Sequence, residues 1–173
     1  MNTTTSLGDN TASPRIGILN RKKSRRLKNV NVLAHELGQA FPMSSVTIKE
    51  FESASFKDQV DFYSSIDILI SPHGAQLTGL PFMPNCGGSV ELTPKGYHIP
   101  YFFASLAVGS GLRHGYVYMS GGDATNETTV MFATRAGRQE ARIANLCPPL
   151  EKIVDAVRIL IDDWRQCCTH VPV

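Results

Sequence analysis

The sequence predicts an α/β fold built on a doubly wound parallel sheet. Short apolar runs alternate with helical patterns along most of the chain, which is the order expected when parallel strands are joined by helices. A buried run at residues 66–70 leads through a Ser-Pro-His-Gly turn into a new apolar segment, a junction typical of such folds. The length of 173 residues is enough for one domain with a proper core.

The elements follow from local patterns. The expected strands lie at residues 16–19, 46–48, 66–70, 88–92 and 116–118. The expected helices run from residue 24 to a stop at Gly38, then over 55–65, 73–83, 100–108 and 149–168. The last is the clearest, because Pro149 suits a first helical position and an apolar stripe continues to Trp164. We interpret residues 15–168 as one Rossmann-like domain.

Three segments fall outside this pattern. Residues 1–14 are expected to form a disordered leader, and residues 169–173 a tail. The apolar residues of segment 120–148 show no clear helical or strand period, and the segment is predicted to be a long loop excursion. No apolar run reaches the roughly 18–20 residues that span a bilayer, and we find no targeting signal. The net charge of +2 is too small to indicate nucleic-acid binding.

The four cysteines leave their pairing open. Cys86, Cys147, Cys167 and Cys168 have no C-x-x-C spacing, so a zinc site is not expected. Their even number permits disulfides in an oxidising compartment without requiring them. The oligomeric state is not predicted by any pattern.

A basic block follows the first strand. Arg21 and Arg25 are four residues apart, and on one helical turn they would point the same way. Two guanidinium groups in that position can bind a diphosphate bidentately. The alternative is a solvated basic face, but the carboxyl end of a strand is where α/β proteins bind ligands.

The turn after the third strand is a second candidate. An expected helix N-terminus binds anions, and Gly74 and Ala75 leave room for the close approach of backbone to phosphate. His73 is interpreted either as a donor to a phosphate oxygen or as a structural side chain beneath the helix start.

Glu91 is the third candidate, the one charge at the end of a buried strand. A buried carboxylate needs a partner, which a ribose diol or an internal arginine would supply. The sequence has no glycine-rich dinucleotide fingerprint, no Walker A motif and no Asp-x-Asp cluster. We therefore expect no metal and no cofactor, with the arginines and the helix terminus neutralising a diphosphate.

These blocks, taken in order, resemble glycosyltransferase family 61. The matching segments are residues 20–25, 71–77, 81–84, 90–94, 97–107 and 111–116, and the branch most similar adds N-acetylglucosamine to proteins. The resemblance implies the C-terminal, donor-binding half of a GT-B enzyme that is inverting and metal-independent and uses a UDP-sugar. It implies a protein or glycan acceptor, and a location in the endoplasmic reticulum or Golgi lumen.

The resemblance also assigns roles. Arg21, Arg25 and the turn from His73 to Ala75 match the residues at the donor diphosphate, and Glu91 matches the acidic residue near the ribose. The family's acceptor half and membrane anchor have no counterpart here, so we expect donor binding without efficient transfer. The general base is not assigned, with His98 kept in reserve. The alternative function is an inactive nucleotide-binding module.

Overall fold

The computed structural model describes residues 13–169, and within them the predicted α/β architecture is confirmed. Most of the expected leader and tail, residues 1–12 and 170–173, lies outside the described part of the chain. The strands are β1 (Ile16–Asn20), β2 (Val46–Glu50), β3 (Ile68–Pro72), β4 (Gly88–Thr93) and β5 (Arg113–Tyr118). The helices are α1 (Val30–Ala40), α2 (Phe56–Ser64), the 3₁₀ helix η1 (Ala75–Phe82), α3 (Phe102–Gly109), α4 (Ala124–Phe132), α5 (Arg135–Ile143) and α6 (Leu150–Thr169).

The five strands form one parallel sheet in the order β2-β1-β3-β4-β5. From β1 the chain first crosses to β2 on one side and later returns to place β3 on the other. The strand order therefore reverses between β1 and β3, and in open α/β sheets ligands bind at the carboxyl ends of the strands beside such a reversal. This places the loops that follow β1 and β3 at the expected ligand site.

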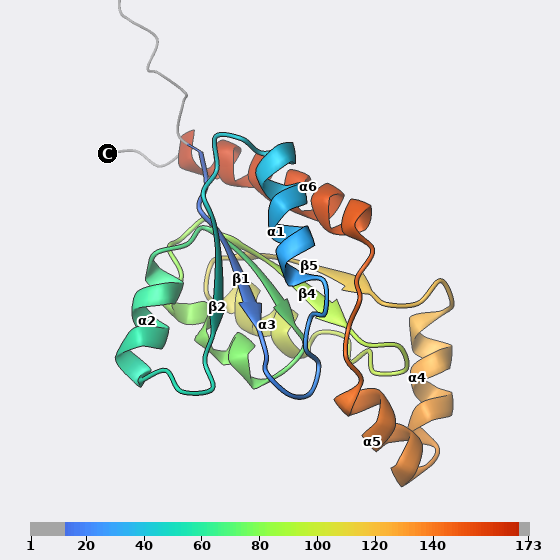
Figure 1. Cartoon of the computed structure of the whole chain (residues 1–173). Helices are drawn as coiled ribbons and strands as arrows, with labels where there is room; N and C mark the ends of the chain where they lie inside the picture. The colour runs from blue at the N-terminus through green and yellow to red at the C-terminus, as the bar shows by residue number, and fades with distance from the viewer. Residues whose placement is uncertain (1–12, 170–173) are drawn as a thin grey trace, which may run out of the picture.

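Helices cover both faces of the sheet (Figure 1). One core cluster joins the sheet to α1 and α6, through side chains such as Leu33 and Val157. The other joins it to α2, η1 and α3, through side chains such as Tyr63, Leu77 and Phe103. No helix in the described part of the chain is both long and apolar enough to cross a membrane.

Two expected helices differ from the prediction. The helix expected from residue 24 begins only at Val30, because residues 21–29 form a loop in which Leu27 bridges to Leu146. The helix after β3 is a 3₁₀ helix with Pro81 inside it. An α-helix there would lose the hydrogen bond of Pro81 and bring its ring against the preceding turn.

The prediction of a loop over residues 120–148 is wrong, because α4 and α5 occupy most of it and lie to one side of the sheet (Figure 1). Each begins at a side-chain cap: Asp123 accepts the N–H of Asn126 at 3.0 Å, and Thr134 accepts that of Gly137 at 3.0 Å. Both helices bury little, which is why no apolar stripe predicted them.

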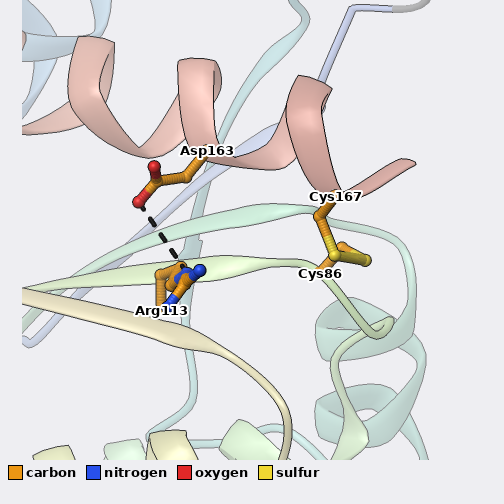
Figure 2. The surroundings of a disulfide bond; sticks show 4 residues. All are labelled: Cys86, Arg113, Asp163 and Cys167. Carbon is orange, nitrogen blue, oxygen red and sulfur yellow. Dashed lines mark ion pairs between the residues drawn. A yellow bond between two sulfur atoms is a disulfide. The ribbon is translucent and has the colours of Figure 1, made fainter. Parts of the chain in front are cut away.

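A disulfide joins Cys86, just before β4, to Cys167 near the end of α6 (Figure 2). Cys147 is exposed and not bonded. The bond closes a separation of 81 residues and fixes the end of α6 to the amino edge of the sheet. Beside the disulfide, Nε of Arg113 at the start of β5 lies 3.8 Å from Oδ2 of Asp163 on α6.

Candidate anion site at the carboxyl edge of the sheet

The loop after β1 is organised by Asn20, which is 2% exposed. Its side-chain oxygen accepts the backbone N–H of Arg21 and of Leu27, both at 2.8 Å, and its amide group donates to the carbonyl of Leu27 at 3.3 Å. One buried amide thus closes both ends of the loop that carries the arginines. Asn20 was not among the predicted site residues; the available signal was an asparagine at the end of a buried strand, directly before a basic block.

Within this loop Arg25 adopts a left-handed conformation with φ of 58° and is 8% exposed. The predicted helical turn does not exist, so the spacing of four is not what brings the arginines together. Both still reach the same place: a Cβ built on Gly74 would lie 2.8 Å from Nη1 of Arg21 and 3.1 Å from Nη1 of Arg25. The two guanidinium groups converge on the turn after β3.

Neither arginine has an acidic partner among residues 13–169. Nε of Arg25 is buried without a hydrogen-bond partner. Burial, followed by repulsion from Arg21, lowers the pKa of Arg25 to about 10, which leaves the guanidinium charged at neutral pH. An unpaired buried cation is costly, and an anion bound between the two arginines would offset that cost.

Gly74 fits this arrangement in two ways. Its φ of 146° and ψ of −177° are accessible almost only to glycine, and a side chain there would strike the guanidinium groups. Ala75 begins η1, so the first N–H groups of that helix lack partners within it. The structure therefore brings together four of the predicted residues, Arg21, Arg25, Gly74 and Ala75.

His73 stands at the end of β3, where its backbone N–H donates to the carbonyl of Leu92 at 2.9 Å. Its ring lies 5.2 Å from those of both Tyr97 and Phe103, and its Nδ1 bonds to Oε1 of Glu91. The side chain is 4% exposed. The ring is thus packed and oriented immediately before the glycine on which the arginines converge.

Glu91 has two histidine partners and no arginine. Besides His73, Nε2 of His114 on β5 lies 3.3 Å from its Oε2, and Ser89 lies 2.9 Å from Nδ1 of His114. Burial acts to raise the pKa of Glu91, but hydrogen bonds from His114 and His73 outweigh it and hold that pKa below its usual value. The alternative partner, an arginine paired with Glu91, is not found among residues 13–169, and the ribose contact stays a prediction.

His114 was not among the predicted site residues, because the fifth strand was expected only from residue 116 and β5 begins at Arg113. His98, kept in reserve as a base, lies in the loop after β4 with its ring 4.7 Å from that of Tyr116. Its Nδ1 is buried without a partner, and it lines a cavity of about 450 Å³ that Glu91 and His114 also reach. Its role as a base stays a prediction.

Among the described residues no group of three or more His, Cys, Asp or Glu side chains could hold a metal ion. The fold and the side chains at its strand-order reversal define an α/β domain with a candidate anion site made of arginines and a glycine turn.

The chain belongs to glycosyltransferase family 61, since the family model described as Glycosyltransferase 61 matches residues 4–90, half of the chain. Relatives named protein O-linked-mannose beta-1,4-N-acetylglucosaminyltransferase 2 are similar to it in several vertebrates. The Xenopus laevis relative is 31% identical over 137 residues, covering 77% of this chain and 23% of that protein. The Mus musculus relative is 33% identical over 102 residues, covering 58% and 17%. The chain spans less than a quarter of the length of these relatives.

Proposed function

We propose that this chain is the donor-binding domain of a glycosyltransferase and binds the diphosphate of a UDP-sugar at Arg21, Arg25 and the turn from His73 to Ala75. The observation that carries the proposal is the pair of guanidinium groups that converge on Gly74 without an acidic partner among the described residues. Their place, beside the reversal of strand order, is where doubly wound folds bind nucleotides.

The proposed chemistry is an inverting, metal-independent transfer to a hydroxyl of a protein or glycan. The acceptor oxygen forms a bond to the anomeric carbon while the bond from that carbon to the UDP oxygen breaks. The acceptor proton passes to a base, for which His98 is held in reserve. The arginines stabilise the negative charge that develops on the UDP leaving group, as oriented cations and N–H groups do in other active sites.

The disulfide supports a location in the endoplasmic reticulum or Golgi lumen. Bonds such as Cys86–Cys167 form and persist in oxidising compartments and are rare in the cytosol. The names of the relatives describe enzymes that modify protein-linked mannose, and a secretory location of this chain is part of the same proposal.

The test is calorimetry with UDP and with uridine. Arg25→Ala should weaken UDP binding by about tenfold to a hundredfold, which corresponds to a loss of about 1.5–3 kcal/mol for one charge-assisted contact. Uridine binding should not change, because the guanidinium acts on phosphate.

Arg26→Ala is the matched control. It removes the same charge from the neighbouring residue, whose side chain is exposed. If Arg26→Ala costs as much as Arg25→Ala, the block is a solvated basic face. If Arg25→Ala weakens uridine and UDP equally, the diphosphate role is wrong.

A further inference from the structure

Four buried or nearly buried side chains form a continuous row of polar contacts beside the candidate anion site. Ser89 and Glu91 lie on β4, His114 lies on β5, and His73 follows β3. Ser89 and Glu91 are 0% and 4% exposed, and His73 is 4% exposed. A buried carboxylate with a histidine on each oxygen is more elaborate than one structural ion pair would require.

The positions of the hydrogens follow from the partners. An ionised carboxylate only accepts hydrogen bonds, so both histidine nitrogens that face Glu91 carry hydrogen. His114 then has its hydrogen on Nε2, and its Nδ1 accepts the hydroxyl hydrogen of Ser89. His73 has its hydrogen on Nδ1. The chain of donors therefore runs from Ser89 and from His73 toward Glu91.

The ring of His73 is fixed in this orientation. Tyr97 and Phe103 pack on it at 5.2 Å, and Phe102 lies 6.3 Å away, so the ring cannot turn over without displacing them. With Nδ1 held by Glu91, Nε2 is the ring nitrogen that remains to contact a ligand. The next residue is Gly74, where Arg21 and Arg25 converge.

We propose that Glu91 is a positioning residue, which acts through His73 and not as a ligand of the ribose. It holds Nδ1–H of His73 so that Nε2 faces the diphosphate, while Ser89 and His114 keep the carboxylate aimed at His73. Donation from Nε2 to a phosphate oxygen requires a hydrogen on Nε2 as well as the one on Nδ1. This inference rests on the proposed diphosphate site and assigns a new role within it.

The decisive experiment is a double-mutant cycle read by UDP and uridine binding. Glu91→Gln and His73→Gln should each weaken UDP binding by about tenfold and leave uridine binding unchanged. The double variant should bind UDP as weakly as His73→Gln alone, because Glu91 has no path to the ligand except through that ring. Glu127→Gln is the control, since Glu127 also accepts two side-chain hydrogen bonds, from Tyr118 and Ser120, away from the arginines.

Nitrogen-15 NMR of the unmodified chain supplies a measurement that needs no variant. His73 should carry its hydrogen on Nδ1, and UDP should move the Nε2 resonance to that of a protonated, hydrogen-bonded nitrogen. A ring with hydrogen on Nε2 and a bare Nδ1 would overturn the inference even if Glu91→Gln failed to fold.

The outcomes also separate this inference from the function on which it rests. In the contrary result, Glu91→Gln weakens UDP and uridine binding equally, with free-energy losses that add to those of His73→Gln. That result would identify Glu91 as a ligand of the ribose and would overturn the positioning role alone. Failure of the unmodified chain to bind UDP would instead overturn the donor-binding function.

Discussion

The amino and carboxyl edges of the sheet both carry arginines and use them in opposite ways. At the amino edge Arg15 donates to Asp67 through its backbone N–H, Nε and Nη2 at 2.8–2.9 Å, which raises the pKa of Arg15. Arg113 faces Asp163 there, and the disulfide lies alongside (Figure 2). At the carboxyl edge Arg21 and Arg25 have no acidic partner within the described residues.

This difference separates stability from binding. A paired charge satisfies its hydrogen bonds within the protein and has little capacity left for a ligand. An unpaired buried charge destabilises the folded state, and that state is stabilised most when an anion binds to the charge. We therefore expect substitutions at the amino edge to change the free energy of unfolding with little effect on UDP affinity. Substitutions at the carboxyl edge should change UDP affinity with little effect on the free energy of unfolding.

The largest effect should come from the disulfide. Replacing Cys86 and Cys167 together by alanine removes a cross-link over 81 residues and should lower the free energy of unfolding by about 2–5 kcal/mol. Denaturant titration followed by circular dichroism measures the change. UDP affinity should stay the same below the unfolding transition, and a variant of full stability that lost UDP binding would contradict the division between the edges.

A smaller loss is expected at the ion pair that precedes β1 and β3. Asp67→Asn should lower the free energy of unfolding by about 1–3 kcal/mol, because the amide has one neutral acceptor oxygen where the carboxylate had two charged ones, and its NH2 group cannot accept from Arg15. Arg25→Met is the contrasting variant at the other edge, and should unfold no more easily than the unmodified chain since it removes a buried unpaired charge. Thermal unfolding of both variants measures this contrast. A large loss of stability in Arg25→Met would contradict the prediction.

The smallest effect concerns metal removal. If the guanidinium groups neutralise the diphosphate, UDP should bind equally well with magnesium and with EDTA, within about twofold. Calorimetry in the two buffers is the measurement. A large loss of affinity on chelation would show that the arginines do not suffice and that the metal-independent proposal is wrong.

The sequence predicted the strands and α6 because their signals are local. The apolar runs in β1, β3 and β4, and the stripe from Leu150 to Trp164, reflect burial against neighbouring layers. The helices α4 and α5 were missed because little of either is buried, which leaves capping residues as the sole local sign.

The site was predicted only in part, because its geometry depends on strand pairing and loop closure. Arg21 and Arg25 were placed together by a helical spacing that the loop does not have. His114 reaches Glu91 only because β5 pairs in register beside β4, with Ser89 opposite His114. No local pattern reports which residues two distant strands place side by side.

The second half of the loop that carries the arginines makes backbone hydrogen bonds to residues more than a hundred positions away in the chain. Arg26 accepts the N–H of Leu146 at 2.9 Å, Lys28 donates to the carbonyl of Leu146 at 2.9 Å, and Arg26 donates to the side chain of Asn145 at 3.1 Å. Contacts of such long sequence separation form late, since much of the chain must be ordered before they offset the entropy of closing the loop. A folding intermediate that already contains β1 to β3 would possess both arginines and still lack the receptor for an anion, so ligand binding reports the completion of folding.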